Sequence, residues 1–339
     1  MTAADHRAAT RTTLTDVATL AGGVTPGTAS KALNGRGKLR PETRQRVLDA
    51  ARRLDFRPNQ LAQSLISGRT WTVGLITTDG IGRFATPVLL GAEDALGTGE
   101  ISVLLCDTRG DVIREQHYLR TLAARRIDGI IVTGRRTDPR PPLAGSTDVP
   151  TVYAFAPSTD PDGINVVSDD RQGTQLAVGH LTGLGRRNIA HVTGPAHHAA
   201  ATDRAAHTTH WLAAAGLPLA TGRVQHGEWS EAWGRQAVRG VLATAPDTDA
   251  IFCGNDQIAR GVTDALRESG RRVPDDIAVV GYDNWDTMAL ASRPPLTSVD
   301  MNLTEIGRLA ALKLLEAIDG RPDPGTHRTP CRLVVRDST

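Results

Sequence analysis

The sequence predicts a small all-α head followed by a larger α/β body of two lobes with parallel sheets. At 339 residues the chain is longer than one compact core usually holds, which indicates more than one folding unit. The first 70 residues show short helical patterns, whereas the residues from 71 onward alternate between apolar strands and longer helices. Such alternation over the body indicates parallel strands with helices on both faces.

Three short helices are predicted in the head, over residues 15–21, 26–33 and from Pro41 onward. Apolar residues recur at helical spacing in the first and third, and Pro26 suits the first position of the second. Thr13 and Thr25 are the expected N-caps of the first two helices, since a threonine hydroxyl there accepts a backbone hydrogen bond. Glycines separate the helices, which is typical of a helix-turn-helix.

A weak helical pattern at residues 59–67 follows the head and is too short to be stable alone. In the body, residues 136–150 contain four prolines and are predicted to form a loop. Strands are predicted at residues 72–76, 102–107, 129–133, 151–155, 189–193, 250–253 and 277–282. Helices are predicted at residues 88–96, 113–125, 171–184, 203–215, 230–243, 256–269 and 304–318.

Charge is divided between the same two parts of the chain. Residues 1–70 contain twelve basic and five acidic residues, a net charge of +7, and the rest contains 27 basic and 32 acidic residues, a net charge of −5. A basic head in front of a mildly acidic body favours a polyanion as partner. An arginine-rich solvated surface is the plainer alternative.

Composition excludes several classes of protein. With 40 % hydrophobic and 22 % charged residues, the chain has the composition of a globular protein. No run of 18 apolar residues and no apolar segment near the start is present, so neither a membrane anchor nor a signal peptide is expected, and the predicted compartment is the cytoplasm. Cys106, Cys253 and Cys331 are far apart, which favours reduced thiols; neither a metal nor a cofactor is expected.

The order and spacing of several short motifs resemble those of the LacI/GalR family of transcriptional regulators over essentially the whole chain. The matching segments are residues 13–18 (TLTDVA), 28–35 (TASKALNG) and 57–65 (RPNQLAQSL), then 128–132 (DGIIV), 254–256 (GND), 273–284 (VPDDIAVVGYDN), 294–299 (PPLTSV) and 333–336 (LVVR). The resemblance implies a disordered tail (1–12), a helix-turn-helix domain (13–57), a hinge helix (58–70) and a periplasmic-binding-protein-like body (71–339) that binds an effector and forms the dimer.

The resemblance also implies DNA-binding roles for residues of the head. The second helix would enter the major groove, where Pro26, Gly27, Ser30 and Lys31 would face base edges. Lys31 stands where the family mostly has arginine, so it would offer a point charge in place of a bidentate fork. Phosphate contacts are implied for Thr13, Thr25, Asn34, Thr43 and Arg44, and Lys38 would reach either backbone or base. A solvated helix face is the alternative for Arg44, and the preferred interpretation for Arg46, Arg52 and Arg53.

In the segment that resembles the hinge helix, Asn59, Ala62 and Leu65 are the implied DNA-binding residues. Leu65 matches the leucine that two subunits insert side by side into the minor groove, although an ordinary core role is the alternative. One departure affects the head: the family has Ala-Gly-Val-Ser between the first two helices, whereas this chain carries an additional glycine at Gly22-Gly23. We expect a local bulge in that turn.

Seven effector-binding residues are implied for the cleft between the lobes: Thr78, Phe84, Thr133, Arg204, Trp229, Asn255 and Asp283. Most of them follow predicted strands, where open α/β sheets bind ligands. Each of the best matches has a structural alternative. Asn255 would simply cap the next helix, Trp229 would belong to the core, and Arg204 would lie on a solvated helix face.

Two departures argue against the family's usual sugar chemistry in this cleft. His207 stands where a glycine is common, and Phe155 replaces a common polar residue, so the cleft is expected to be crowded and less polar. A different ligand, or no response to a ligand, remains open at this stage.

Enzymes and solute-binding proteins are the rival classes. Residues 80–85 (GIGRFA) fit a dinucleotide-binding pattern, and Asp107 ends the next predicted strand like a ribose-binding acid. Pro87, however, is expected to start the following helix after the glycine run, which disfavours a phosphate site. His197, His198, His207 and His210 lack the partners of a metal site.

The resemblance therefore implies a cytoplasmic, non-enzymatic transcriptional repressor that binds a near-palindromic operator as a homodimer. A small molecule, often a sugar in this family, would alter operator affinity through allosteric linkage between the two sites. Dimer and tetramer both stay open, although a dimer is the default because no heptad tail follows Asp319.

Overall fold

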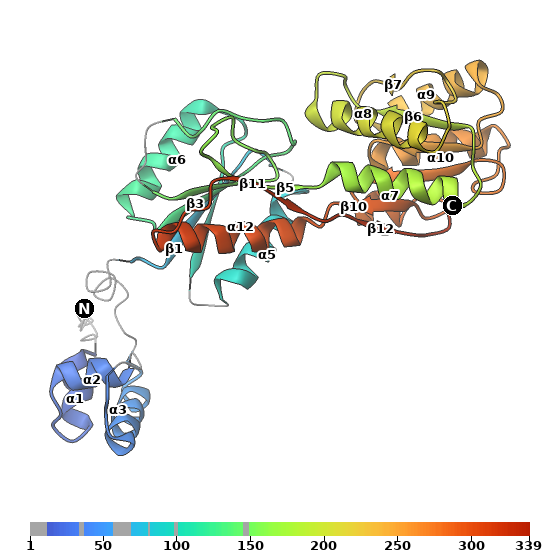
Figure 1. Ribbon diagram of the computed structural model, residues 1–339. Helices are drawn as coiled ribbons and strands as arrows, with labels where there is room; N and C mark the ends of the chain where they lie inside the picture. Colours follow the sequence, from blue (N-terminus) through green and yellow to red (C-terminus); the bar gives the residue numbers. More distant parts are fainter. Residues whose placement is uncertain (1–11, 34–36, 57–68, 81, 98–100, 145–148) are drawn as a thin grey trace, which may run out of the picture. The chain divides into compact units, whose positions relative to one another are not determined.

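The computed structural model describes residues 12–33, 37–56, 69–80, 82–97, 101–144 and 149–339. The chain divides into two compact units, residues 1–70 and 71–339 (Figure 1). The expected disordered tail at residues 1–12 falls outside the described residues except for Thr12, and so does the hinge helix except for its last two residues.

The described residues of the head form three helices, α1 (Leu14–Leu20), α2 (Pro26–Leu33) and α3 (Pro41–Arg53), as predicted. Thr13 caps α1 in a reciprocal capping box with Asp16: each accepts a hydrogen bond from the other's backbone N–H. Thr25 accepts a hydrogen bond from the N–H of Thr28 at the start of α2, at 3.1 Å. The small core that these helices share is made of Val17, Ala18, Ala21, Ala29, Ala32, Val47, Ala50 and Ala51.

The turn between α1 and α2 contains two left-handed glycines in succession. Gly22 has φ +93° and Gly23 has φ +72°, and the N–H groups of both lie within hydrogen-bond distance of the carbonyl of Thr19, at 3.2 Å. Val24 then donates to the carbonyl of Ala18, which returns the chain to the helix end. The additional glycine is therefore absorbed within a hydrogen-bonded turn, and both flanking helices keep their predicted positions.

The body contains two six-stranded sheets, and apart from the antiparallel pair β10 and β12 all the strand pairs are parallel. The first lobe orders its strands as β11 (Gly325–Thr329), β5 (Ile164–Ser168), β4 (Thr151–Ala154), β3 (Gly129–Thr133), β1 (Thr72–Thr77) and β2 (Ser102–Asp107). The second lobe orders them as β12 (Arg332–Val334), β10 (Thr297–Asp300), β9 (Ala278–Tyr282), β8 (Ala250–Cys253), β6 (Ile189–Thr193) and β7 (Gln225–His226). The predicted two-lobed α/β body is confirmed.

The helices divide between the two lobes. In the first lobe α5 (Ala85–Leu96) packs along α12 (Leu303–Ile318), and α6 (Val112–Ala124) follows β2. The second lobe contains α7 (Asp170–Gly183), α8 (Ala199–Ala214), α9 (Glu231–Thr244), α10 (Asp256–Glu268) and the short α11 (Asp286–Ala289). The chain passes between the lobes three times, from β5 to α7, from β10 to α12 and from β11 to β12 (Figure 1).

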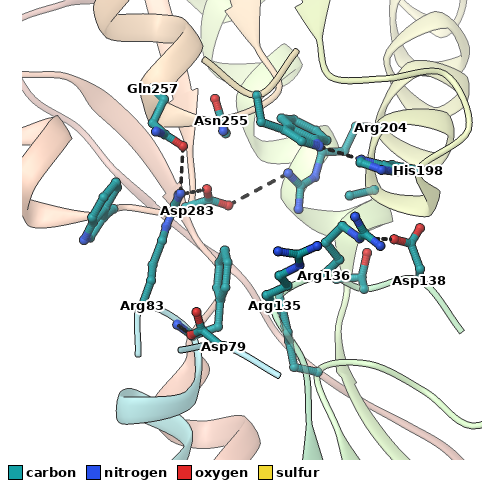
Figure 2. A pocket seen from close by; sticks show the side chains of 16 residues that line it. Asp79, Arg83, Arg135, Arg136, Asp138, His198, Arg204, Asn255, Gln257 and Asp283 are labelled. Atoms are coloured by element: carbon teal, nitrogen blue, oxygen red, sulfur yellow. Dashed lines mark hydrogen bonds and ion pairs between the residues drawn. The ribbon is translucent and has the colours of Figure 1, made fainter. Parts of the chain in front are cut away.

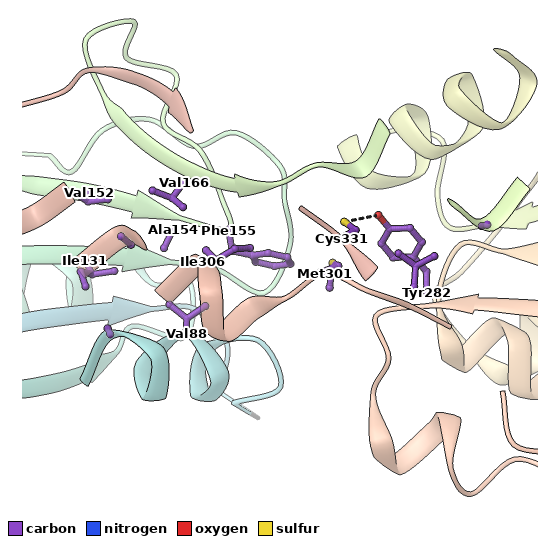
Figure 3. Close-up of a cluster of buried hydrophobic side chains, with 14 of the residues drawn as sticks. Val88, Ile131, Val152, Ala154, Phe155, Val166, Tyr282, Met301, Ile306 and Cys331 are labelled. Carbon is purple, nitrogen blue, oxygen red and sulfur yellow. Dashed lines mark hydrogen bonds between the residues drawn. The ribbon is translucent and has the colours of Figure 1, made fainter. Parts of the chain in front are cut away.

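A buried apolar cluster continues from one lobe to the other at these crossings (Figure 3). It includes Phe155 at the end of β4, Met301 between β10 and α12, and Cys331 between β11 and β12. Tyr282, at the end of β9, donates a hydrogen bond to Asp170 at 2.7 Å and lies 3.8 Å from the thiol of Cys331. The connection between the lobes is thus packed as a core.

All seven predicted body strands are present, but five strands were missed. The structure adds β5, β7, β10, β11 and β12. β7 has only two residues, and β10 and β11 carry mainly Thr, Ser, Asp, His and Arg, so hydrophobic periodicity does not reveal them. The loop predicted at residues 136–150 contains no helix or strand over the residues described there.

The expectation that Pro87 starts the helix after the glycine run was wrong. α5 begins at Ala85, because the carboxylate of Asp79 accepts hydrogen bonds from the backbone N–H groups of Phe84 at 2.6 Å and Ala85 at 3.0 Å. Pro87 lies within the first turn, where a backbone N–H has no helical partner, so it is tolerated there.

Candidate functional site

A cavity of about 420 Å³ lies between the two lobes, within the size range of small-molecule sites (Figure 2). Its walls come from segments that follow β1, β3 and β4 in the first lobe, and from α8 and segments that follow β7, β8 and β9 in the second. The lining residues are Asp79, Arg83, Phe84, Arg135, Arg136, Thr137, Asp138, Phe155, His198, Ala200, Arg204, Trp229, Asn255, Gln257, Asp283 and Trp285.

Aromatic side chains from both lobes form much of the wall. In the first lobe, Phe84 and Phe155 stack with ring centroids 4.7 Å apart. In the second lobe, the indole N–H of Trp229 donates to Nδ1 of His198 at 2.8 Å, and the two rings are nearly parallel. Trp285 lies beneath the guanidinium of Arg83, 4.2 Å from the ring centroid. Flat apolar faces of this kind can hold a ring-shaped ligand.

Asp283 is held between two arginines at the centre of the cavity (Figure 2). Arg83 comes from the first lobe and bonds one carboxylate oxygen of Asp283, and the other oxygen lies 3.9 Å from Arg204. Arg83 also donates to the side-chain oxygen of Gln257 at 3.1 Å. These contacts join the two lobes directly across the cavity.

Arg204 is almost fully buried, with 3 % of its surface exposed, so the solvated-face alternative was wrong. Its guanidinium donates to the carbonyl of Gly254 at 2.7 Å, lies 3.3 Å from the carboxylate of Asp170, and stacks 3.6 Å from the ring centroid of Tyr282. Burial alone would lower the pKa of Arg204, but the nearby acidic groups, Asp170 first among them, raise it above its usual value. Arg204 is therefore a fixed positive charge at the cavity wall.

Behind this wall lies a second buried carboxylate, that of Asp256 at the start of α10. It accepts hydrogen bonds from the hydroxyl of Ser298 at 2.6 Å and from the N–H of Trp285 at 2.7 Å. Burial, followed by the charge of Asp283, raises the pKa of Asp256 to about 8. The group is therefore mainly protonated near neutral pH.

Asn255 and Trp229 each combine the structural position named as an alternative with a place in the cavity wall. Asn255 caps α10 by accepting a hydrogen bond from the N–H of Ile258 at 2.8 Å, and it also lines the cavity. Trp229 packs against the core of the second lobe, where its ring fills the space beside Gly194, and it faces the cavity as well.

The structure brings together five of the seven residues implied for the cleft: Phe84, Arg204, Trp229, Asn255 and Asp283. Thr78 and Thr133 are not among the lining residues. Thr78 accepts the N–H of Arg135 at 3.3 Å, and the hydroxyl of Thr133 is buried without a hydrogen bond in the described part of the chain. His207 does not line the cavity either, so the expected crowding by this residue is absent, whereas Phe155 does form part of the wall.

The sequence analysis did not assign several lining residues to the cleft, and half of them are charged. These are Asp79, Arg83, Arg135, Arg136, Thr137, Asp138, His198, Ala200, Gln257 and Trp285. Arg83, Arg135, Arg136 and Asp138 belong to the loops that follow β1 and β3. The rule that ligands bind beyond the carboxyl ends of parallel strands would have pointed to these loops.

The geometry disfavours a dinucleotide phosphate at the glycine run of residues 80–85. Such a phosphate would need the free N–H groups at the start of α5, but the carboxylate of Asp79 already occupies two of them. Asp107 accepts a hydrogen bond from the N–H of Arg109 at 2.9 Å. In the described ranges no group of three His, Cys, Asp or Glu residues is arranged to hold a metal ion, and no helix there is long and apolar enough to cross a membrane.

In the head, the surface around the start of α2 is open to solvent. Thr25, Pro26, Gly27 and Lys31 are exposed and Ser30 is half-buried, so the side chains implied to read bases lie on or next to the free face of α2. Thr13 and Lys38 are also exposed, and Thr43 and Arg44 are half-buried on α3. The remaining implied DNA-binding residues, Asn34, Asn59, Ala62 and Leu65, lie outside the described residues.

Two family profiles match the chain. Residues 13–59 match the profile described as bacterial regulatory proteins of the lacI family, and residues 178–339 match a periplasmic binding protein-like domain.

Curated proteins and solved structures match nearly the whole chain. The HTH-type transcriptional regulator CelR of Thermobifida fusca is 34 % identical over 97 % of this chain and 98 % of that protein. The structure of a CelR–cellobiose complex is 32 % identical, covers 97 % of this chain and 100 % of that chain, and has a TM-score of 0.68. A lac repressor dimer bound to operator and the anti-inducer ONPF is 27 % identical, covers 96 % and 98 % of the two chains, and has a TM-score of 0.75.

Proposed function

Because the chain belongs to the lacI family of bacterial regulatory proteins, we propose that it is a sequence-specific DNA-binding transcriptional repressor whose operator affinity depends on a small molecule bound in the cleft. The observation that carries this proposal is the joining, in one chain, of a three-helix head with an open face on α2 to a two-lobed body that encloses a cavity. Neither part alone would indicate a ligand-responsive regulator.

In the proposed complex with DNA, α2 enters the major groove. Lys31 reads a base edge there, and Thr13, Thr25 and Thr43 hold phosphates that fix the register of the helix. The proposed organisation keeps a tail at residues 1–12, the head at 13–57, a hinge helix at 58–70 and the effector-binding body at 71–339. In the hinge helix, Leu65 is the proposed minor-groove wedge.

The acting species is proposed to be a homodimer on a near-palindromic operator, since two-fold symmetry of the protein requires two related half-sites. Exposed apolar side chains on the first lobe support such a dimer interface. Leu90, Leu105, Val112 and Ile113 are more than half exposed. The repressor acts in the cytoplasm, where its DNA partner is, and performs no catalysis of its own.

Effector and operator are coupled through the arrangement of the lobes. The ligand and the operator are proposed to favour different arrangements of the lobes. Each of them then lowers the protein's affinity for its counterpart by the same factor. A sugar or sugar derivative is the proposed class of effector. The aromatic walls at Phe84, Phe155 and Trp229 support it, as does the cellobiose bound to the related CelR.

The test is selection of fragments from sheared genomic DNA by the purified protein at physiological salt, followed by sequencing. We expect recovery of a discrete near-palindrome. Lys31→Ala should relax one base position in each half-site, whereas Arg53→Ala, an exposed arginine on α3, should leave the selected sequence unchanged. Binding that is blind to sequence would contradict the proposal.

A further inference from the structure

We propose that the cleft ligand carries an anionic group, a carboxylate or a phosphate, and that the guanidinium of Arg135 holds it. This inference rests on the proposed function, because it concerns the same cleft, and it narrows the class of effector from sugars in general to cyclic molecules with a negative charge.

The charges that line the cavity are unequal. Four arginines face three aspartates, so the lining carries one more positive than negative charge. All three carboxylates already have partners within the protein. Asp79 accepts the two N–H groups at the start of α5, and Asp283 is held by Arg83 and Arg204. Asp138 pairs with Arg136 at 2.7 Å and accepts the N–H of Ala199 at 2.8 Å.

Three of the four lining arginines are paired with carboxylates of the protein. Arg83, Arg136 and Arg204 each have a carboxylate partner, whereas no hydrogen bond or ion pair joins the guanidinium of Arg135 to the described residues. Arg135 is therefore the charge in the lining that a ligand can neutralise without displacing a partner. A planar guanidinium binds carboxylate and phosphate oxygens in pairs, which suits it to this role.

The backbone at Arg135 is fixed even though its side chain is exposed. Its N–H donates to the hydroxyl of Thr78 at 3.3 Å, just beyond the end of β1. The preceding Gly134 lies so close to Ala156 that an added Cβ would meet that side chain at 3.1 Å. The loop is thus anchored to the neighbouring strand ends, and the side chain extends from a defined point into the cavity (Figure 2).

The other lining residues indicate what the uncharged part of the ligand is like. The stacked pair Phe84 and Phe155 lies in the same lobe as Arg135, and Trp229 faces the cavity from the other lobe. A ring bound among these aromatic side chains would share the cavity with the guanidinium of Arg135. Each of the three lining carboxylates already has a partner in the protein, and Oδ2 of Asp138, which accepts no hydrogen bond from the described residues, still lies in an ion pair. A neutral sugar would therefore compete with protein groups for most of these acceptors.

Three probes with a common pyranose ring test the proposal: D-glucose, D-glucuronate and D-glucose 6-phosphate, which differ only in the group at carbon 6. Their affinities are measured by calorimetry on the full-length protein at constant ionic strength. We expect at least one of the two anions to bind more tightly than glucose, and the preferred anion distinguishes carboxylate from phosphate as the natural group.

Arg135→Gln should weaken the affinity for the bound anion about tenfold, because a charge-assisted pair is lost. Arg223→Gln removes an exposed arginine of the body outside the cavity and should change nothing, which controls for the loss of one positive surface charge. Tighter binding of glucose, no binding of either anion up to 10 mM, or equal anion affinity in Arg135→Gln would overturn the proposal.

Selection of genomic DNA by the same preparation separates this inference from the proposed function. Recovery of a palindrome together with neutral ligand preference would overturn only the anionic ligand. Failure of the selection would count against the regulator itself, whatever the cleft binds.

Discussion

Arg83 bonds Asp283 across the cleft and so joins a loop of the first lobe to a strand end of the second, 200 residues further along the chain. A second direct contact lies near the opposite side of the cavity, where Asp138 of the first lobe accepts the N–H of Ala199 at the start of α8. The lobes are therefore held together by the protein's own polar groups. A ligand that binds Asp283 must compete with Arg83, which gives the cleft a direct means of changing the lobe arrangement.

Replacing Arg83 should loosen the closed cleft. In Arg83→Gln, Asp283 keeps only the more distant Arg204, and the stacking of the guanidinium on Trp285 is lost. We expect a loss of about 1–3 kcal/mol of unfolding free energy and faster hydrogen exchange in residues 82–90 and 283–290. Arg272→Gln, which breaks an exposed ion pair with Asp276, should cost much less. Equal exchange in the two variants would show that Arg83 does not hold the lobes.

Close packing between α5 and α12 depends on glycine. A Cβ added at Gly307 would lie 2.0 Å from the carbonyl oxygen of Val88, which is backbone and cannot move aside. We expect Gly307→Ala to lower the unfolding free energy by about 1–3 kcal/mol in urea titrations, although alanine is the better helix former.

Gly240→Ala is the matched control for that helix effect. Gly240 lies inside α9 with no atom within 4 Å of an added Cβ. The substitution should therefore stabilise the protein by about 0.5–1 kcal/mol. If both glycine variants shift the midpoint in the same direction, close backbone approach is not the reason for Gly307.

The additional glycine of the head gives a prediction of a different kind, since Gly23 has φ +72° but free space around it. Asparagine tolerates this left-handed conformation, whereas valine does not. We expect Gly23→Val to destabilise the head by about 1–2 kcal/mol and Gly23→Asn by less, as measured by hydrogen exchange of the peptides that cover α1 and α2. A larger effect from asparagine would contradict the turn geometry.

Local patterns predicted the parts of the fold that depend on local physics. Thr13 and Thr25 cap their helices as expected, because capping needs only residues three positions apart. The start of α5 was missed, because its cap is Asp79, whose carboxylate folds back over a short loop. β10 and β11 were missed because they carry polar residues that the sheet accommodates through pairing with β9 and β5.

The site was predicted in part for a similar reason. Residues directly after strands, such as Asn255 and Asp283, reach the cavity because the ends of parallel strands converge there. Arg83 and Arg135 were missed because, although their loops follow parallel strands, no local signal shows which side chains of a loop face the other lobe. The contact between Arg83 and Asp283 depends on how two lobes close, which is set by the crossings at Met301 and Cys331 and not by sequence neighbours.

The buried carboxylate of Asp256 should make stability fall as pH rises. An aspartate in the unfolded chain has a pKa near 4, whereas burial raises the pKa of Asp256 in the folded protein to about 8. Between these values the folded protein keeps a proton that the unfolded chain has released. The free-energy penalty of this group therefore vanishes below pH 4 and reaches its full size above pH 8.

Asp256→Asn should remove this pH dependence while keeping the fold. Its amide oxygen can still accept the N–H of Trp285, and its NH₂ can donate to the hydroxyl oxygen of Ser298, which reverses the bond that Ser298 donates to Asp256. We expect the difference in unfolding free energy between pH 5 and pH 8 to decrease in this variant, measured by urea titration at both values. Asp247→Asn, at an exposed loop position, should leave that difference as it is in the unaltered protein. An undiminished difference in Asp256→Asn would mean that Asp256 is ionised in the folded state, with the nearby arginine charges outweighing the effect of burial.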